Sequence, residues 1–257
     1  MTAMNLIVQE KAGAVYLLTD TAAFNEADGS IHSFWPKVAG VVIGDDGYAA
    51  VATSGKMFFQ HIQPHIADMK AASLRDFISA FPAAFRAGEK ASRSEGGHGS
   101  MAAVVAVCNQ RTGKVAGYGI ANDSCLWPGR YAPYSMTPLK KHLTGFDPDQ
   151  YPDLAQADFC DPACWNPARD GADLMEAQRA DPFDFGIGVG GQAILTCVDK
   201  SGISHQVIKA WPDRPFQPID LNRGEKPGWI GRVRANMLMR DRPPRTIAIG
   251  GLATEMA

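Results

Sequence analysis

Residues 1–24 read MTAMNLIVQEKAGAVYLLTDTAAF, and this stretch decides the fold. Two apolar runs, 5–9 and 14–19, flank a Lys-Ala-Gly turn at 11–13, which predicts a β-hairpin near the start of the chain. The second run ends on a carboxylate, Asp20, and one lysine, Lys37, follows a short way beyond it. One interpretation is a catalytic centre built around the first residues of the chain. The other is the remains of such a centre.

The bulk properties describe an ordinary globular chain. Its 257 residues are 46% hydrophobic and 20% charged, with a formal net charge of −2, so we expect no nucleic-acid partner and no anionic membrane partner. No apolar run approaches the roughly 20 residues that cross a bilayer. The first residues have neither a basic region nor a long apolar run, so we expect no secretion signal. The five scattered cysteines are interpreted as reduced thiols in an intracellular setting.

More hairpins and two helices follow along the chain. Apolar runs separated by short polar turns predict strand pairs at 39–43 with 48–53, 101–109 with 114–121, and 193–199 with 204–211. Between the first and second of these pairs the spacing becomes helical, from Met57 to Met69 and again after a capping serine, Ser73. Hairpin-connected strands are antiparallel, and the helices come in a block, so we predict an α+β fold with layered sheets.

Two segments lack this regularity. Residues 122–184 are rich in Pro, Asp and aromatic residues, and we interpret them as an irregular insertion of a single domain, 1–257, with short helices predicted at 139–142 and 174–179. Residues 212–257 form a C-terminal extension, with a helix predicted at 229–239 and a strand at 246–249.

The order of these features resembles a known family. A short hairpin ends in Thr19-Asp20, Lys37-Val38 and a second hairpin follow, and Ser54-Gly55 runs into two helices. This order resembles the N-terminal-nucleophile (Ntn) hydrolase fold, specifically the proteasome β-subunit family, over the first 121 residues and more weakly over 193–211. The resemblance implies a four-layer αββα sandwich with two antiparallel sheets between helices.

The resemblance also implies a site. In this family the mature chain begins with a threonine whose hydroxyl attacks a peptide carbonyl while its own α-amine acts as the base. The nearest candidate here is Thr2. Lys37 matches the lysine that lowers the proton affinity of the nucleophile, Asp20 the carboxylate that holds that lysine, and Gly55 the oxyanion-hole amide. A buried ammonium beside a hydroxyl favours an alkoxide-like transition state. We expect no cofactor and no metal.

Three departures from the family pattern concern the chemistry. Counting back from Asp20 by the usual two-strand spacing leads to Ala3 and Met4, neither of them a nucleophile, and Gly55 comes somewhat late. The family's Gly-Ser-Gly turn has as its nearest match residues 186–191, GIGVGG, which contain no serine. These departures predict a divergent, inactive member that serves as a structural or assembly subunit, including a phage or virion component. The alternative is an active threonine peptidase or amidohydrolase whose Thr2 is exposed by removal of Met1.

Aromatic and arginine side chains gather in the irregular segment, as they do in interface cores. We therefore expect protein partners, in a homo-oligomer or a multi-subunit assembly, either in the cytoplasm or in a virion. The residues concerned are Trp127, Arg130, Tyr131, Tyr134, Phe146, Tyr151, Phe159, Trp165 and Phe183, with Arg232, Arg234, Arg240 and Arg242 in the extension.

Other motifs have simpler interpretations. The run GIGVGGQ at 186–192 has the wrong spacing for a dinucleotide fingerprint and leads into a strand, so we interpret it as a turn. Cys160 and Cys164 have a spacing at the edge of what structural zinc uses, with no second pair evident. His61 and His65 lie one helical turn apart without the glutamate of a metalloprotease helix. No Gly-x-Ser-x-Gly elbow is present.

Overall fold

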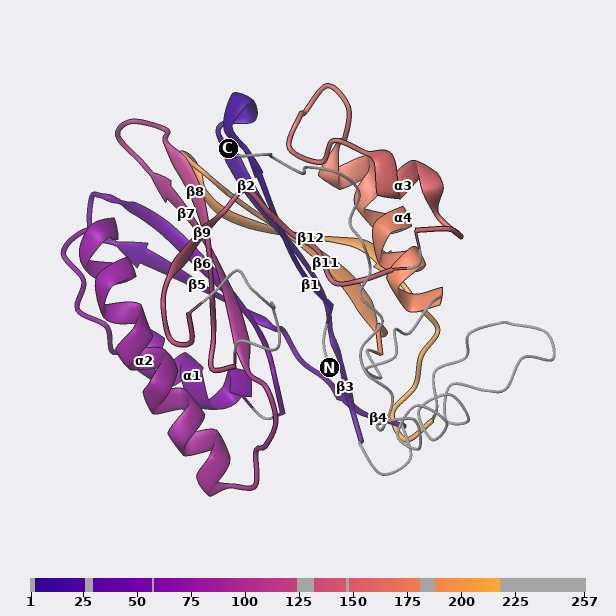
Figure 1. Ribbon diagram of the computed structural model, residues 1–257, viewed down its shortest axis with the longest axis horizontal. Helices are drawn as coiled ribbons and strands as arrows, with labels where there is room; N and C mark the ends of the chain where they lie inside the picture. Colours follow the sequence, from indigo (N-terminus) through magenta and orange to yellow (C-terminus); the bar gives the residue numbers. More distant parts are fainter. Residues whose placement is uncertain are drawn as a thin grey trace, which may run out of the picture.

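The computed structural model describes residues 3–25, 30–56, 58–123, 132–146, 148–180 and 188–217. Two antiparallel five-stranded sheets form its centre, and helices cover the outer face of each (Figure 1). The predicted α+β, four-layer αββα sandwich is therefore confirmed.

The first sheet contains the hairpin that ends on Asp20. Its strand order is β10-β1-β2-β11-β12, and the pairing of β1 with β2 is regular from Met4 opposite Thr19 to Gln9 opposite Ala14. The strands are β1 (Met4–Gln9), β2 (Ala14–Asp20), β10 (Lys141–His142), β11 (Gln192–Asp199) and β12 (Gly202–Ala210).

The second sheet has the order β5-β6-β7-β8-β9. Lys37 directly precedes its first strand, and Gly55 directly follows its second. A separate ribbon of β3 (Ala22–Phe24) and β4 (Ile31–Phe34) lies between β2 and this sheet in the chain. The strands of the second sheet are β5 (Val38–Ile43), β6 (Gly47–Ser54), β7 (Ala102–Asn109), β8 (Val115–Ala121) and β9 (Thr137–Leu139).

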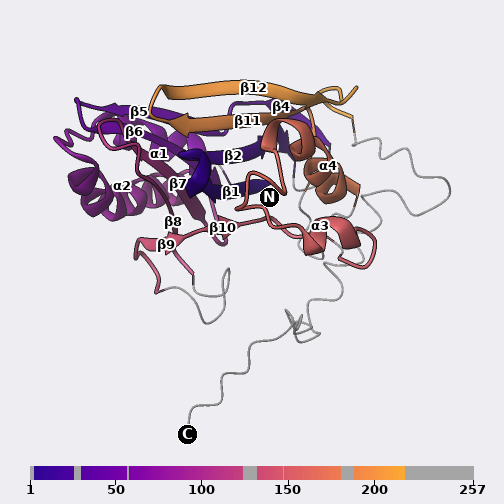
Figure 2. The same ribbon diagram turned by 90° about the horizontal axis from the view of Figure 1, so that it is seen from above.

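Three apolar layers hold the sandwich together. Helices α1 (Phe58–Ala67) and α2 (Leu74–Ser94) pack phenylalanines against the outer face of the second sheet. Alanine, valine and leucine side chains fill the space between the two sheets. On the far side, α3 (Pro152–Gln156) and α4 (Pro167–Ala180) cover the first sheet, where Leu174 and Met175 are buried (Figure 2).

The local predictions hold where the pattern is periodic. Ser73 caps α2 as expected, because its hydroxyl accepts a hydrogen bond from the Asp76 amide at 3.1 Å. The helix continues well beyond Phe81, through Pro82 to Ser94. The short helix predicted at 174–179 belongs to the longer α4. The prediction of a helix at 139–142 is wrong. These residues lie in and between β9 and β10, which pair with the edges of the two sheets.

The segment expected to be irregular contributes structure of its own. Its described part contains β9, β10, α3 and α4, and α4 forms the main part of the fourth layer. The helix predicted at 229–239, the strand predicted at 246–249, and Trp127, Arg130, Tyr131 and Phe183 lie outside the described residues.

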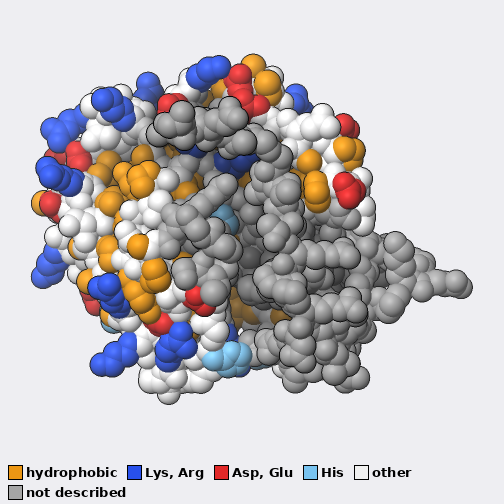
Figure 3. All heavy atoms as spheres, in the orientation of Figure 1, with side chains coloured by type: hydrophobic (Ala, Val, Ile, Leu, Met, Phe, Trp, Pro, Cys, Tyr) orange, Lys and Arg blue, Asp and Glu red, His pale blue; other side chains and the backbone are white. Residues whose placement is uncertain are grey.

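Charged side chains are mixed with apolar ones on the surface. On the face seen in Figure 3, lysine and arginine side chains lie singly among neutral, acidic and apolar ones over the α1–α2 side. No helix among the described residues combines the length and the apolar character needed to cross a membrane.

Candidate functional site

Asp20 and Lys37 meet where β2 ends and β5 begins. The Lys37 ammonium donates one hydrogen bond to Asp20 Oδ1 at 2.8 Å and another to the Ala22 carbonyl oxygen at 2.6 Å. The lysine side chain is 8% exposed and the carboxylate 0%. A buried ion pair needs such geometry, because its mutual attraction must offset the cost of removing two charges from water.

Three backbone amides complete the surroundings of the Asp20 carboxylate. The Ala3 amide donates to Oδ1 at 3.1 Å, while the amides of Ala22 and Gly190 donate to Oδ2 at 3.2 and 3.3 Å. With the ammonium, the carboxylate accepts four N–H donors. Only the ionised carboxylate offers acceptors to all of them.

Burial and pairing act in opposite directions on these two groups. Burial raises the pKa of Asp20, while the Lys37 charge and the Gly190 amide lower it. Burial lowers the pKa of Lys37, and the contact with Asp20 opposes that shift. The net direction is downward for Lys37 and upward for Asp20, because burial outweighs pairing for both groups.

The hairpin brings the start of the chain to this pair. Because Met4 pairs with Thr19, the preceding residue, Ala3, lies beside Asp20 and its amide reaches the carboxylate. The hairpin turns through a short 3₁₀ helix (Glu10–Ala12), which ends on Gly13 at φ +64°. Thr2, the nucleophile candidate, lies outside the described residues.

Gly55 lies at the same end of the second sheet. It follows β6 three residues after Ala52, which pairs with Val38, the residue next to Lys37. Its φ of +138° suits glycine, and a Cβ there would lie 2.9 Å from Met101 Cγ. Gly55 is not among the residues that line the cavity beside Lys37, so the structure places it near the pair without joining it to the cavity.

The glycine-rich segment supplies a group that the sequence reasoning missed. The family resemblance implies a serine in this segment, whereas its Gly190 contributes a backbone amide to Asp20. In the sequence, the cluster of glycines was the feature that could have indicated this role. A Cβ on Gly191 would lie 2.4 Å from Thr21 Oγ1, and one on Gly190 would lie 3.2 Å from the Ala22 Cβ. The segment leads into β11 rather than a helix, as a turn does.

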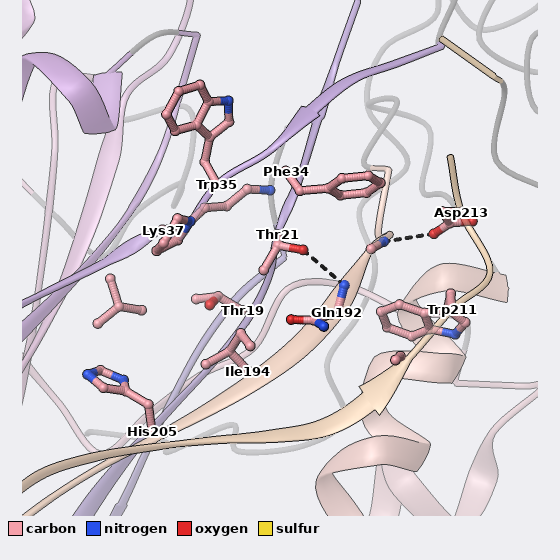
Figure 4. Close-up of a pocket in the computed structure, with 14 residues that line it drawn as sticks. Thr19, Thr21, Phe34, Trp35, Lys37, Gln192, Ile194, His205, Trp211 and Asp213 are labelled. Carbon is pink, nitrogen blue, oxygen red and sulfur yellow. Dashed lines mark hydrogen bonds between the residues drawn. The ribbon is translucent and has the colours of Figure 1, made fainter. Parts of the chain in front are cut away.

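A cavity of about 610 Å³ opens beside Lys37 (Figure 4). Figure 4 shows Lys37 and Trp35 on one side, with His205 and Ile194 across from them. Most of the lining is apolar, from Phe34, Trp35, Pro36, Val38, Ile194, Ala210 and Trp211. The cavity therefore offers room for an apolar side chain next to the buried ammonium.

The other candidate groups are engaged elsewhere. Cys160 Sγ approaches the Lys140 carbonyl oxygen at 3.5 Å, and Cys164 is exposed. His61 Nε2 lies 3.5 Å from a carboxylate oxygen of Glu95. Within the described ranges, no three His, Cys, Asp or Glu side chains come together as a metal site.

Comparison of the sequence with family models and with curated proteins gave no match. Solved structures do match over nearly the whole chain. Anbu (ancestral beta-subunit) from Yersinia bercovieri has a TM-score of 0.53 at 9% identity, covering 95% of this chain and 99% of its own. Anbu from Hyphomicrobium sp. strain MC1 has a TM-score of 0.51 at 10% identity, covering 96% and 100%.

A third likeness is to a structure described as the helical assembly of the Anbu complex from Pseudomonas aeruginosa. Its TM-score is 0.52 at 13% identity, covering 96% of this chain and 99% of that one. At these identities the likeness concerns the fold alone. The chain thus has the proteasome-like fold of the Anbu subunits, from the first hairpin to the last.

Proposed function

We propose that this chain is an N-terminal threonine hydrolase of peptide or amide bonds, with Thr2 as its nucleophile once Met1 has been removed. One observation carries the proposal. The Asp20 oxygen that accepts the Lys37 ammonium at 2.8 Å also accepts the Ala3 amide at 3.1 Å. Ala3 is the covalent neighbour of Thr2, so the proposal puts the Thr2 hydroxyl beside that ammonium.

The position of Ala3 is relevant to whether catalysis has been lost. By the family's usual strand spacing, Ala3 or Met4 would stand at the position of the nucleophile. The hydrogen bond from the Ala3 amide to Asp20 instead supports Ala3 as the residue that follows the nucleophile, which is then Thr2.

The proposed reaction has two steps. The Thr2 α-amine takes the hydroxyl proton as Oγ attacks the carbonyl carbon, and it returns that proton to the departing amine, which leaves an ester on Thr2. Water, losing a proton to the α-amine, then attacks the ester carbonyl; the bond to Oγ breaks, the acyl product leaves as a carboxylic acid, and the proton passes to Oγ to restore the free hydroxyl. The Lys37 ammonium stabilises negative charge on Oγ, Asp20 holds Lys37 in place, and the Gly55 amide is proposed to bind the carbonyl oxyanion.

The experiment combines mass spectrometry with substitutions of Thr2. The intact protein from its cellular source should lack the mass of one methionine, and it should hydrolyse members of a set of fluorogenic peptide amides with apolar, basic or acidic residues before the scissile bond. Thr2→Ala should abolish hydrolysis, whereas Thr2→Ser, the matched control, should retain part of it. Retention of Met1, or unchanged hydrolysis by Thr2→Ala, would overturn the proposal.

A second candidate is a non-catalytic assembly subunit, in the cytoplasm or as a phage or virion component. The observation that favours it is the glycine turn, which presents the Gly190 amide to Asp20 where the family resemblance implies a serine. The helical assembly of the Pseudomonas aeruginosa Anbu complex supports a multi-subunit state for either candidate. Hydrolysis that depends on Thr2 would exclude the non-catalytic one.

A further inference from the structure

A second buried ion pair lies behind the glycine turn. Arg179, near the end of α4, forms a bidentate ion pair with Asp213, which follows β12. Its Nη2 donates to Oδ1 at 2.7 Å and its Nη1 to Oδ2 at 2.8 Å. The two side chains are 5% and 1% exposed, and the guanidinium also stacks on the Trp211 ring at 4.9 Å.

The Arg179–Asp213 ion pair forms hydrogen bonds with the glycine turn on both sides of Gly190. Arg179 Nη1 donates to the Val189 carbonyl oxygen at 2.7 Å, and Asp213 Oδ2 accepts the Gly191 amide at 2.7 Å. Figure 4 shows the latter bond as a dashed line at Asp213. Both neighbours of Gly190 are therefore held by charge-assisted hydrogen bonds, which are stronger than bonds between neutral groups.

Gly190 in turn connects the turn to the Asp20–Lys37 pair. Its amide donates to Asp20 Oδ2 at 3.3 Å, and its carbonyl oxygen accepts the amides of Thr21 and Ala22 at 3.3 and 3.2 Å. The fit is close, because a Cβ on Gly190 would lie 2.9 Å from Asp213 Oδ2 and 3.3 Å from Arg179 Nη1. Because Val189 and Gly191 are both hydrogen-bonded to the ion pair, a shift of the pair would displace the chain on both sides of the Gly190 amide.

We propose that Arg179 and Asp213 are positioning residues, which hold the Gly190 amide on Asp20 and thereby keep Asp20 directed at Lys37. As a role in catalysis this rests on the proposed function, but the effect on Asp20 does not. The fold does not need such a pair for its stability, because well-packed apolar side chains can often replace a buried ion pair without loss of stability. What apolar side chains cannot do is bond the Val189 carbonyl and the Gly191 amide.

The experiment replaces the pair by apolar side chains and follows Asp20 directly. The double variant R179M/D213L removes both charges at once, so that the net charge near Asp20 is unchanged. The carboxyl ¹³C signal of Asp20 is titrated by NMR, and the pH dependence of hydrolysis is measured alongside. We expect the Asp20 midpoint to move to higher pH, because its carboxylate loses a firmly held donor, and kcat to fall at least tenfold with little change in KM.

The matched control makes the same exchange at another ion pair. Glu89 accepts hydrogen bonds from Arg93 at 2.8 Å and from Asn122 at 2.7 Å on the α2 side of the molecule. E89L/R93M should lower the unfolding free energy without moving the Asp20 midpoint. R179K keeps the charge but not the two-pronged hydrogen bonding to Asp213, so its Asp20 midpoint should lie between those of wild type and the double variant. R179K is used in place of R179M/D213L if that variant does not fold.

The outcomes separate this inference from the proposed function. An Asp20 midpoint that stays in place in a folded R179M/D213L or R179K protein overturns the inference. A midpoint that moves equally in the control also overturns it, because the effect is then one of general destabilisation. If the wild type hydrolyses nothing and the midpoint still moves only in the Arg179 and Asp213 variants, the positioning role stands and the proposed function fails.

Discussion

Lys37 and Lys11 each pair with an aspartate, but the Lys37 side chain is buried and the Lys11 side chain is exposed. The Lys37 side chain is 8% exposed and that of Lys11 is 73% exposed. We predict that Lys37→Met lowers the unfolding free energy by about 3–5 kcal/mol, because it leaves the Asp20 charge buried without an ammonium. Lys11→Met removes a screened pair with Asp161 and should cost less than about 1 kcal/mol.

Urea unfolding of the two lysine variants measures this difference. Asp20→Asn combined with Lys37→Met should recover part of the loss, since no unpaired charge then remains. Equal effects of Lys37→Met and Lys11→Met would contradict the assignment of a buried ion pair at the Asp20 site.

His142, in the edge strand β10, provides a pH-dependent prediction. Burial lowers its pKa from 6.5 to about 4, so the unfolded chain takes up a proton at a pH where the folded one does not. Stability from this group is complete above pH 6.5 and is lost as the pH falls toward 4. Because the side chain keeps part of its surface exposed, we expect a loss on the order of 1–2 kcal/mol.

The measurement compares the unfolding free energy of wild type and His142→Asn between pH 7 and pH 4. Carboxylates contribute to acid destabilisation in both proteins, so the difference between the two curves isolates His142. Parallel curves through this range would contradict the predicted shift.

At the scale of elements, the contact between α1 and α2 depends on one small residue. A Cβ on Gly88, in α2, would lie 2.8 Å from both Cα and Cβ of Ile62 in α1. On an exposed helix, Gly→Ala stabilises by about 1 kcal/mol. Here we predict the opposite sign for Gly88→Ala, a net loss of about 1–3 kcal/mol, because the two helices must separate.

Thermal or urea unfolding checks the sign of this effect. Ser79→Ala, at an exposed position of the same helix, serves as the control and should be neutral or slightly stabilising. A stabilising Gly88→Ala would show that the helices do not touch at Ile62.

At the scale of the whole molecule, the prediction concerns assembly. Trp35 is 59% exposed at the mouth of the cavity, and Phe216 is 79% exposed. Aromatic residues such as Trp and Phe are enriched in the cores of protein interfaces. We expect sedimentation velocity to show species well above the 27.6 kDa of one chain, as rings, filaments or a complex with a partner. A well-behaved monomer at all concentrations, without a partner, would contradict this.

Much of the site follows from local patterns along the chain. The apolar runs around Lys11–Gly13 predict the hairpin, and the hairpin places Asp20 at the end of a strand. Lys37 and Gly55 were carried over from the family resemblance in the order of the elements. The hairpin turns and the Ser73 cap were also predictable, because each depends on residues within a few positions of one another.

Only the tertiary structure could show what surrounds the pair. The Gly190 amide is a backbone group that no residue type marks in the sequence. It reaches Asp20 across 170 positions of the chain, and Arg179 reaches Asp213 across 34. The β9 and β10 strands likewise exist because the edges of two sheets pair with them. Periodicity along a chain determines its elements, but contacts between distant residues are decided by how those elements pack, and packing determined which groups meet at Asp20.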